Sequence, residues 1–264
     1  MNIWHYIIIL ITLFMMTTIP TKKRKNMSWM KGISAHRGWF FEDQSIAENS
    51  MSAFKQALEK NIDIELDIQM TADRQVIVFH DANLQRMCKV DVSVKESTYN
   101  DIKQYTFHNS DESIPTLQEV LAEIDGKVNV FIEIKPTDLV DEVCQQVVLQ
   151  LDQYKGNFAI CSFNPLVLMW LRKNRPNYIR GQNIQFFLFD KRQSLLNRVL
   201  LTINGYNIFT RADYISVHIG IVKFFTWMRI FKGFLSCWAV SNETDYRQLK
   251  KKVDHLIIEF IEYD

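Results

Sequence analysis

The residues from Asn61 to Met70, N-I-D-I-E-L-D-I-Q-M, alternate between polar and apolar side chains. Side chains along a β-strand point to opposite faces with a period of two, so the pattern predicts a strand over residues 62–69. Glu65 and Asp67 then share one face, and the apolar residues occupy the other. Neighbouring carboxylates repel each other, and a hard divalent cation such as Mg²⁺ or Ca²⁺ relieves this because it prefers oxygen ligands. The alternative is the polar, solvent-facing side of an antiparallel strand.

A second predicted strand ends in similar chemistry. Residues 128–135 read V-N-V-F-I-E-I-K and are followed by Pro136, a residue that ends strands. Glu133 and Lys135 share a face at the carboxyl end of this run. A third carboxylate beside a cation fits a metal site, and it equally fits an ordinary surface ion pair.

Two histidines also follow predicted strands. His36 comes directly after the short run G-I-S-A, and His80 closes the run V-I-V-F. Arg37 is next to His36, and its planar guanidinium can bind two phosphate oxygens. Histidine exchanges a proton near neutral pH. A lone histidine at a strand end is usually structural, but two of them beside an arginine and three carboxylates indicate a catalytic site.

Predicted strands and helices alternate along most of the chain. The patterns predict eight strands, at residues 32–35, 62–69, 128–134, 157–162, 178–188, 213–217, 234–240 and 254–258. A hairpin-like arm is predicted at 76–80, and helices at 50–60, 116–124, 138–154 and 165–174. Such alternation favours a parallel sheet, and eight strands favour its closure into a barrel. The length of 264 residues fits one barrel of this kind, which typically needs about 250.

At these positions the chain resembles the glycerophosphodiester phosphodiesterase family. The resemblance covers roughly residues 31–260 and rests on an ordered set of motifs: H-R-G at 36–38, E-N-S at 48–50, E-L-D-I-Q-M-T at 65–71, H-D at 80–81, I-P-T-L-Q-E at 114–119, E-I-K-P at 133–136, S-F-N at 162–164 and W-A-V-S-N at 238–242. Any single motif is weak, whereas the ordered set is specific. The resemblance implies a (β/α)8 TIM barrel, an α/β fold whose active site lies at the carboxyl ends of the strands.

The resemblance also assigns roles to the residues that bear charge or exchange protons. Glu65, Asp67 and Glu133 would hold a divalent metal, either Mg²⁺ or Ca²⁺. His36 and His80 would be the catalytic acid and base, in an order that the sequence leaves open.

Four further residues would complete the site. Arg37 and Lys135 would contact the substrate phosphate, Trp238 would line the pocket wall, and Glu48 would lie near the metal or orient its ligands. The implied reaction is the hydrolysis of a glycerophosphodiester to glycerol 3-phosphate and an alcohol, or of a lysophospholipid to lysophosphatidate. Two alternatives stay open: a membrane-tethered phosphodiester-binding protein with little activity, and a phospholipase C or D type of enzyme on the same barrel.

The composition excludes some functions and leaves others. The chain has 31 basic and 30 acidic residues, a net charge of +1, so no global field attracts nucleic acid. A hydrophobic fraction of 47% supports a large core. The four cysteines are scattered without zinc-ligand spacing, which predicts reduced and mostly buried thiols.

The N-terminus is almost wholly apolar from residue 3 to residue 19 and is followed by the basic run Lys22 to Lys25. We interpret residues 1–21 as a transmembrane anchor, 22–30 as a basic juxtamembrane linker and 31–264 as the barrel. About 17 apolar residues is the short limit for a membrane span, and basic residues flanking a span favour the cytoplasmic side. The sequence thus predicts a single-pass membrane protein with a cytoplasmic barrel. The alternatives are a cleaved signal or a helix packed on the barrel.

Residues 184–232 are unusually apolar and basic. The preferred interpretation is a set of outer barrel helices whose inward faces must be apolar. A membrane-facing rim is the alternative, because basic residues interleaved with aromatic ones are typical of interfaces.

Overall fold

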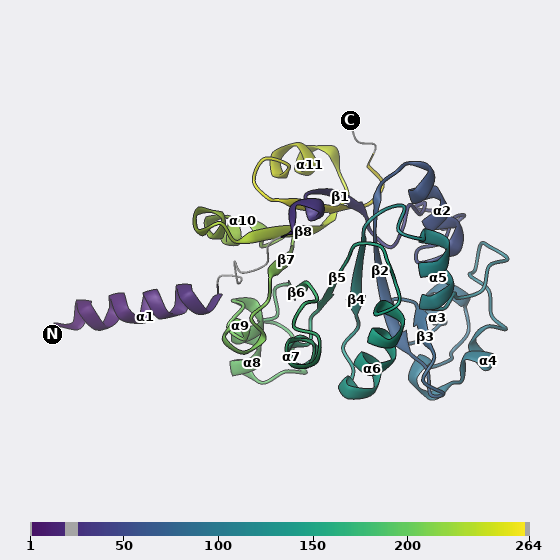
Figure 1. The fold of residues 1–264 in the computed structure, drawn as a ribbon, viewed down its shortest axis with the longest axis horizontal. Coiled ribbons are helices and arrows are strands. Elements are labelled where there is room, and N and C mark those ends of the chain that lie inside the picture. The colour runs from purple at the N-terminus through teal and green to yellow at the C-terminus, as the bar shows by residue number, and fades with distance from the viewer. Residues whose placement is uncertain (1, 19–25, 262–264) are drawn as a thin grey trace.

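The strands of the computed structural model, which describes residues 2–18 and 26–261, form one closed barrel (Figure 1). The sheet order is β1-β9-β8-β7-β6-β5-β4-β2-β3, and β1 also pairs with β2, which closes the ring. The eight strands of the ring are all parallel: β1 (Gly32–Ala35), β2 (Asp63–Met70), β4 (Val130–Ile134), β5 (Phe158–Ser162), β6 (Arg180–Ile184), β7 (Tyr214–His218), β8 (Phe234–Val240) and β9 (His255–Ile258). The short strand β3 (Val76–Val78) runs antiparallel to β2. The predicted (β/α)8 barrel and its hairpin-like arm are confirmed.

Helices connect the strands and cover the outside of the ring. The α-helices after β1 are α2 (Met51–Glu59), α3 (Gln85–Cys88), α4 (Tyr99–Ile102), α5 (Leu117–Ile124), α6 (Val140–Leu151), α7 (Pro165–Asn174), α8 (Leu195–Thr202), α9 (Asn207–Thr210), α10 (Val222–Phe225) and α11 (Glu243–Leu249). The described part of the chain also contains three 3-10 turns, η1 (Ser28–Met30), η2 (Val94–Glu96) and η3 (Thr226–Phe231). Local sequence sets several of the helix starts, because Thr116 and Glu119 form a reciprocal capping box and Asn164 precedes Pro165 at the first helical position of α7.

The alternating pattern of β2 divides its side chains between two environments. Ile64, Leu66 and Ile68 are fully buried in the main core between the sheet and the helices. Glu65 and Asp67 point the other way, into the barrel, where they are only 3% and 1% exposed. The two faces of β2 were predicted correctly, and the alternative of a solvent-facing polar face is wrong because a closed parallel sheet has no such face.

The amino-terminal end of the barrel interior is filled by apolar side chains. Met30, Phe131, Ala159, Cys161 and Tyr214 form a separate core cluster there. Gly181 makes room for the Tyr214 ring, since a Cβ at Gly181 would lie 2.2 Å from a ring carbon. This end is therefore closed by packing, as in other barrels of this kind.

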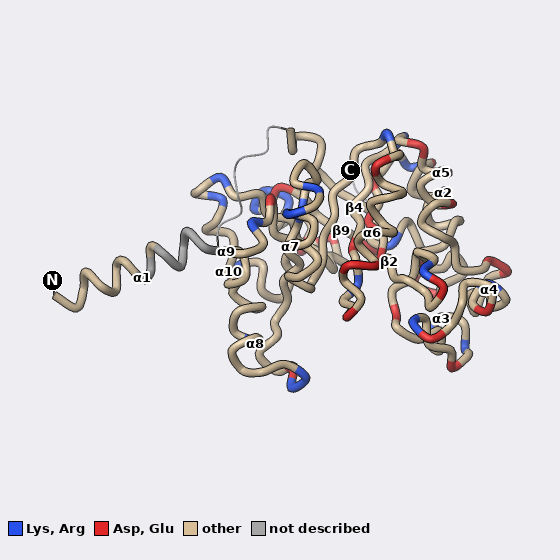
Figure 2. The backbone as a smooth tube through the Cα atoms, turned by 60° about the horizontal axis from the view of Figure 1, so that its bottom comes forward, with Lys and Arg blue, Asp and Glu red and all other residues tan. Residues whose placement is uncertain are grey.

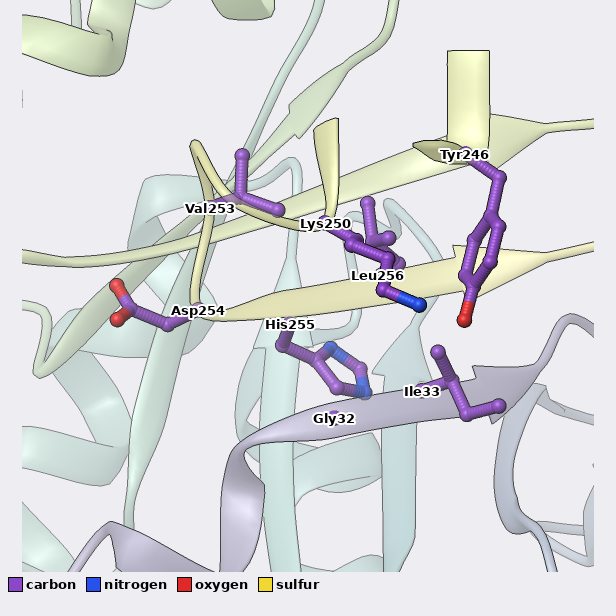
Figure 3. Close-up of a pocket in the computed structure, with 8 residues that line it drawn as sticks. All are labelled: Gly32, Ile33, Tyr246, Lys250, Val253, Asp254, His255 and Leu256. Atoms are coloured by element: carbon purple, nitrogen blue, oxygen red, sulfur yellow. The ribbon is translucent and has the colours of Figure 1, made fainter. Parts of the chain in front are cut away.

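A small cavity of 210 Å³ lies beside β1, β9 and α11, where Ile33, Tyr246 and Lys250 line it (Figure 3).

All four cysteines are buried and free, which confirms the prediction of reduced, buried thiols.

The apolar N-terminus forms the helix α1 (Ile3–Thr18), which projects away from the barrel near α9 (Figure 1). Ile3, Trp4 and Ile8 on this helix are 71%, 66% and 61% exposed. Within residues 2–18 and 26–261, no helix combines the length and the apolar character that crossing a membrane requires. The end of the predicted anchor and the basic run Lys22 to Lys25 lie outside the described residues.

Candidate active site

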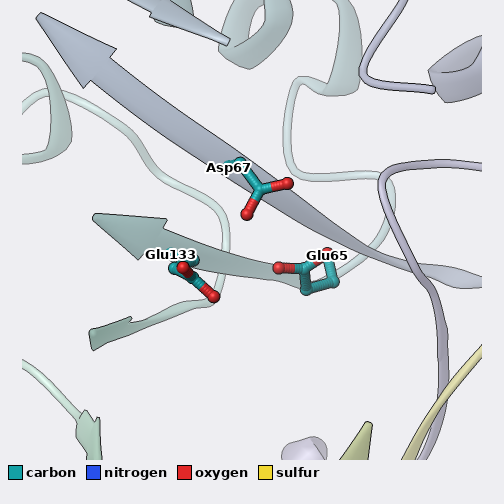
Figure 4. Close-up of side chains that lie close together, drawn as sticks. All are labelled: Glu65, Asp67 and Glu133. Atoms are coloured by element: carbon teal, nitrogen blue, oxygen red, sulfur yellow. The ribbon is translucent and has the colours of Figure 1, made fainter. Parts of the chain in front are cut away.

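Three buried carboxylates on β2 and β4 meet inside the barrel. Glu65 and Asp67 come from β2, and Glu133 comes from β4, where the strand register places it beside Asp67. One oxygen of each residue lies within 4.8 Å of the other two (Figure 4). The three side chains face a common space inside the barrel. The structure therefore brings together the residues that the sequence analysis selected as metal ligands.

The carboxylates differ in how their charges are compensated. Asp67 lies 3.4 Å from Lys135 Nζ and 3.2 Å from Arg37 Nε; burial raises its pKa, but these two cations outweigh burial and hold the pKa well below its usual range. Burial and the charge of Asp67 raise the pKa of Glu65 to about 8. Burial also raises the pKa of Glu133, only partly offset by Lys135 Nζ at 2.8 Å.

This arrangement suits a hard divalent cation. All three potential ligand atoms are carboxylate oxygens, which Mg²⁺ and Ca²⁺ prefer, and oxygens bound to one such ion lie no more than roughly 4–5 Å apart because each bond is about 2.0–2.6 Å long. Two carboxylates with raised pKa values in a buried site indicate that the cationic side chains leave part of the negative charge uncompensated. A bound cation would supply that compensation.

Arg37 connects the carboxylate cluster to its surroundings. Its guanidinium lies between Asp67 and Glu48, whose Oε1 accepts a hydrogen bond of 2.7 Å. The backbone of Arg37 has φ +54°, a left-handed conformation that is strained for a residue with a side chain, and its amide donates to Glu65 Oε2 at 3.1 Å. Gly38 follows with φ +79°, and a Cβ there would lie 2.9 Å from Ala53. Close packing of the turn against α2 therefore holds Arg37 in place.

Glu48 acts on this site through arginines. It accepts hydrogen bonds from Arg37 and from both terminal nitrogens of Arg86, at 3.0 and 2.6 Å. Burial raises the pKa of Glu48, but Arg86 and Arg37 outweigh burial and lower it. Of the two roles considered for Glu48 from the sequence, its contacts fit the orientation of neighbouring groups.

His36 and His80, the two predicted catalytic histidines, each have a carboxylate next to the Nδ1 atom. His36 Nδ1 lies 3.1 Å from Glu259 Oε1, and His80 Nδ1 lies 2.6 Å from Asp81 Oδ1. A carboxylate only accepts hydrogen bonds, so the Nδ1 atom of His80 carries the proton and its Nε2 is the atom left for substrate. Burial lowers the pKa of His36, but Glu259 and Glu65 outweigh burial and raise it. The Nε2 of His36 lies 3.8 Å from Glu65.

These groups line one large cleft of about 1580 Å³. Eight of the nine residues predicted for the site line it, namely His36, Arg37, Glu65, Asp67, His80, Glu133, Lys135 and Trp238, while Glu48 lies behind Arg37. Trp238 packs edge-to-face against Phe163 and His218. Apolar side chains line the cleft as well, namely Phe163, Leu166, Met169, Phe187, Leu201 and Phe209, together with polar ones such as Asn197 and Tyr206. Its lining can therefore contact both a charged group and an apolar group.

Sequence reasoning missed four residues that support the site. Asn49 Nδ2 donates to Asp67 at 3.0 Å, Asn183 Nδ2 donates to Glu133 at 2.7 Å, and Glu259 contacts His36. Arg86 links Glu48 with Asp81. A charged residue at the end of an apolar strand was the signal that selected Glu133, and the same signal exists at Glu259 in L-I-I-E-F.

The comparisons with known proteins agree with this geometry. The chain belongs to the glycerophosphoryl diester phosphodiesterase family, whose model matches residues 36–263. The predictions of this family and of membership in an enzyme class are thereby confirmed.

Individual relatives lie at moderate distance. The chain is 33% identical to a glycerophosphodiester phosphodiesterase of Caldanaerobacter subterraneus over 55% of its length and 63% of the relative's. A glycerophosphodiester phosphodiesterase of Bacillus subtilis is 26% identical over 89% of the chain and 86% of the relative. A lysophospholipase D of Rattus norvegicus is 31% identical over 55% of the chain, and the match spans 49% of that protein.

A phosphodiesterase of Oleispira antarctica, solved in complex with the product sn-glycerol-3-phosphate, is similar in fold. Its TM-score is 0.72 at 20% identity, and the match covers 88% of this chain and 94% of the other. At this level of identity the likeness supports the barrel fold.

Proposed function

We propose that this protein hydrolyses glycerophosphodiesters with the help of a divalent metal held by Glu65, Asp67 and Glu133. The observation that carries the proposal is the buried carboxylate cluster at the base of a cleft that two histidines and two cations also line. A phosphodiester needs both features, because the reaction develops negative charge on phosphate oxygens and transfers protons at the attacking and leaving groups. Mg²⁺ or Ca²⁺ bound to the cluster would act as a Lewis acid toward a phosphate oxygen.

Arg37 and Lys135 would bind the remaining phosphate oxygens. Both side chains line the cleft and are held by carboxylates on one side, so they have little conformational entropy left to lose when substrate binds. Arg37 offers a planar pair of donors and Lys135 a compact charge. Trp238 would form the wall against the glycerol or the alcohol portion.

His36 and His80 would exchange the protons of the reaction. One Nε2 atom takes the proton of the attacking hydroxyl as its oxygen bonds to phosphorus. The other Nε2 gives a proton to the alcohol oxygen as its bond to phosphorus breaks. Asp81 would hold the Nδ1 proton of His80, and Glu259 and Asp81 would each stabilise the neighbouring imidazole when it is charged.

The cleft favours a substrate with an apolar portion. Its lining combines carboxylates and cations with apolar side chains, and a lysophospholipid has the matching polar and apolar portions. Lysophospholipase D relatives and the product complex of the Oleispira antarctica protein support products of the classes lysophosphatidate and glycerol 3-phosphate. We therefore propose both soluble glycerophosphodiesters and lysophospholipids as substrates.

Residues 1–21 would anchor the protein in a membrane, with 22–30 as a basic linker and the barrel in the cytoplasm. Support comes from the apolar, exposed side chains of α1 and from the basic run that follows in the sequence. Alkaline extraction of membranes tests this proposal. Protein that remains in the membrane pellet supports an anchor, and protein released into the soluble fraction contradicts it.

The decisive experiment offers the purified protein a panel of substrates. Glycerophosphocholine, glycerophosphoethanolamine, glycerophosphoglycerol and lysophosphatidylcholine are each incubated with Mg²⁺, with Ca²⁺ or with chelator, and the products are identified by mass. Metal-dependent release of glycerol 3-phosphate or lysophosphatidate, lost in Glu65→Ala, supports the proposal. Binding without turnover would favour a phosphodiester-binding protein, and a cyclic phosphate or another phosphoester would favour a phospholipase C or D type of reaction.

A further inference from the structure

The connection between β6 and β7 exposes an unusual amount of apolar surface. We call residues 185–210 the α8 segment. Within it Phe189, Leu195 and Leu196 are 82%, 69% and 67% exposed. The helix α8 has no buried residue, whereas α7 buries Val167, Leu168 and Leu171. An outer helix normally buries an apolar stripe against the sheet, and α8 does not. The interpretation of residues 184–232 as ordinary outer helices therefore fails for α8.

Hydrogen bonds hold the α8 segment in a defined conformation. Tyr206 donates a 2.6 Å hydrogen bond to Asn197 across the segment. Arg198 Nε donates to the carbonyl of Gln193 at 2.8 Å, and Thr202 Oγ1 accepts from the amide of Phe187 at 3.1 Å. These bonds fix the path of the chain, so the exposed leucines and Phe189 are presented in a defined arrangement.

The α8 segment lies at the end of the molecule from which α1 projects. In Figures 1 and 2 the elements α1, α8, α9 and α10 gather at this same end. Phe209 on α9, Phe224 on α10 and Ile230 on η3 are 54%, 63% and 79% exposed. Several separate elements at this end thus carry exposed large apolar side chains, and exposed apolar surface of this amount is typical of an interaction site.

The charges of this region favour an anionic partner. Residues 185–232 contain seven basic side chains and two acidic ones, Asp190 and Asp213. Asp213 is buried, and Asp190 pairs with Arg192 at 2.8 Å. The projecting end of the α8 segment carries basic residues at its tip (Figure 2). Apolar side chains flanked by lysine and arginine are the composition that binds the headgroup region of an anionic bilayer.

We propose that the α8 segment is a bilayer-contact surface that seats the mouth of the active-site cleft on anionic phospholipid. Phe189, Leu195 and Leu196 enter the headgroup and upper acyl region, while the exposed Lys191 faces the phosphates. The segment also forms part of the cleft wall through Asn197 and Leu201. A lysophospholipid leaving the bilayer would thus reach the apolar side chains of the cleft without crossing water, a consequence that rests on the proposed function, whereas the bilayer contact itself does not.

The contact is tested directly by fluorescence on the full chain. Because the native cysteines are buried, Leu196→Cys can be labelled selectively with a polarity-sensitive dye. Leu149→Cys on α6, an exposed leucine at 56%, is the matched control. Both are mixed with vesicles of phosphatidylcholine and phosphatidylglycerol that contain lipids brominated high on the acyl chain, since an interfacial element lies about 5–10 Å deep. Quenching and a blue shift at position 196 but not at 149 are expected.

No quenching at position 196 overturns the proposal, and a doubled mass in sedimentation would then assign the surface to a second copy of the chain. Quenching that is equal in pure phosphatidylcholine overturns the preference for anionic lipid.

Enzyme activity provides a second test of the bilayer contact, independent of fluorescence. The double variant Leu195→Ser/Leu196→Ser should lose activity severalfold on lysophosphatidylcholine in anionic vesicles and keep full activity on soluble glycerophosphocholine. Leu149→Ser should keep both. Equal activity of the double variant on vesicles contradicts the role of the surface in catalysis. A wild type with no activity on glycerophosphocholine would instead count against the proposed function. The failure of the proposed function and the failure of the bilayer-contact proposal are therefore distinguishable.

Discussion

The two ends of the barrel interior are built from the same strands and have opposite character. Phe131 and Glu133 lie two residues apart on β4, on the same face. Phe131 is 1% exposed, stacks on His255 with ring centroids 4.2 Å apart, and belongs to the apolar cluster at the amino-terminal end of the barrel. Glu133 belongs to the carboxylate cluster. One strand therefore contributes to stability at its start and to chemistry at its end.

The difference shows where the fold tolerates strain. The apolar cluster at the amino-terminal end is stabilised by packing. The carboxylate cluster instead holds side chains with raised pKa values and lies beside Arg37, a residue at positive φ. Buried like charges destabilise a fold unless something compensates them. Changes at the carboxyl end should therefore affect activity most, and changes at the amino-terminal end should affect stability most.

The largest effect is expected from Glu65→Gln. Activity should fall by at least about a thousandfold, because a metal site contributes several kcal/mol of charge stabilisation. In chelator the variant should unfold at a higher temperature than the wild type, since one buried carboxylate is gone. Turnover and thermal melts measure both quantities, and Glu59→Gln on the exposed end of α2 is the control. A variant that keeps its activity would remove Glu65 from the site.

Replacing either His36 or His80 should lower the activity by about 10²–10⁴-fold. His36→Gln and His80→Gln should both lower kcat. Asp81→Asn should have a smaller effect of the same sign, because it leaves the His80 ring in place and weakens the hold on its Nδ1 proton and the pairing with Arg86. Steady-state kinetics on glycerophosphocholine checks all three. A change confined to KM would contradict proton transfer by these residues.

At the other end, Phe131→Ala should destabilise the protein by about 3–5 kcal/mol, the usual cost of removing a buried aromatic ring. The kcat of the remaining folded protein should be close to that of the wild type. Denaturant unfolding and turnover at low temperature separate the two quantities. A loss of kcat comparable to that of the histidine variants would show that the two ends are coupled.

The smallest effect concerns pH. Burial lowers the pKa of His255 to about 3, against about 6.5 in an unfolded chain. Between these values the unfolded state binds a proton that the folded state does not, so stability falls as pH falls below about 6.5, by up to about 1.4 kcal/mol per pH unit. His255→Gln should remove this contribution. Unfolding free energies measured from pH 4 to pH 7 should give a shallower slope in the variant, and parallel slopes would contradict the assignment.

Sequence reasoning located the parts of the molecule that depend on local pattern. The alternation of β2 predicted which residues face the barrel interior. The positions of His36, His80 and Glu133 at the ends of apolar runs selected them, and the family motifs assigned their roles. Pairings between distant residues were missed. Glu259 approaches His36 because β9 pairs with β1, and Asn183 reaches Glu133 across the barrel interior. Such contacts follow from barrel closure and register, which a one-dimensional pattern does not contain. The exposure of α8 was hidden for a related reason, because an apolar pattern does not say against what a helix packs.

The central claim is that the carboxylate cluster holds a divalent metal, and thermal unfolding with and without metal tests it most directly. A cation that binds only the folded state stabilises it by mass action. Millimolar Mg²⁺ or Ca²⁺ should raise the unfolding temperature of the wild type by roughly 5–10 °C relative to chelator, if it reaches about 100 times its dissociation constant. Glu133→Gln should lose most of this rise. Equal unfolding temperatures of the wild type in metal and in chelator would contradict the account.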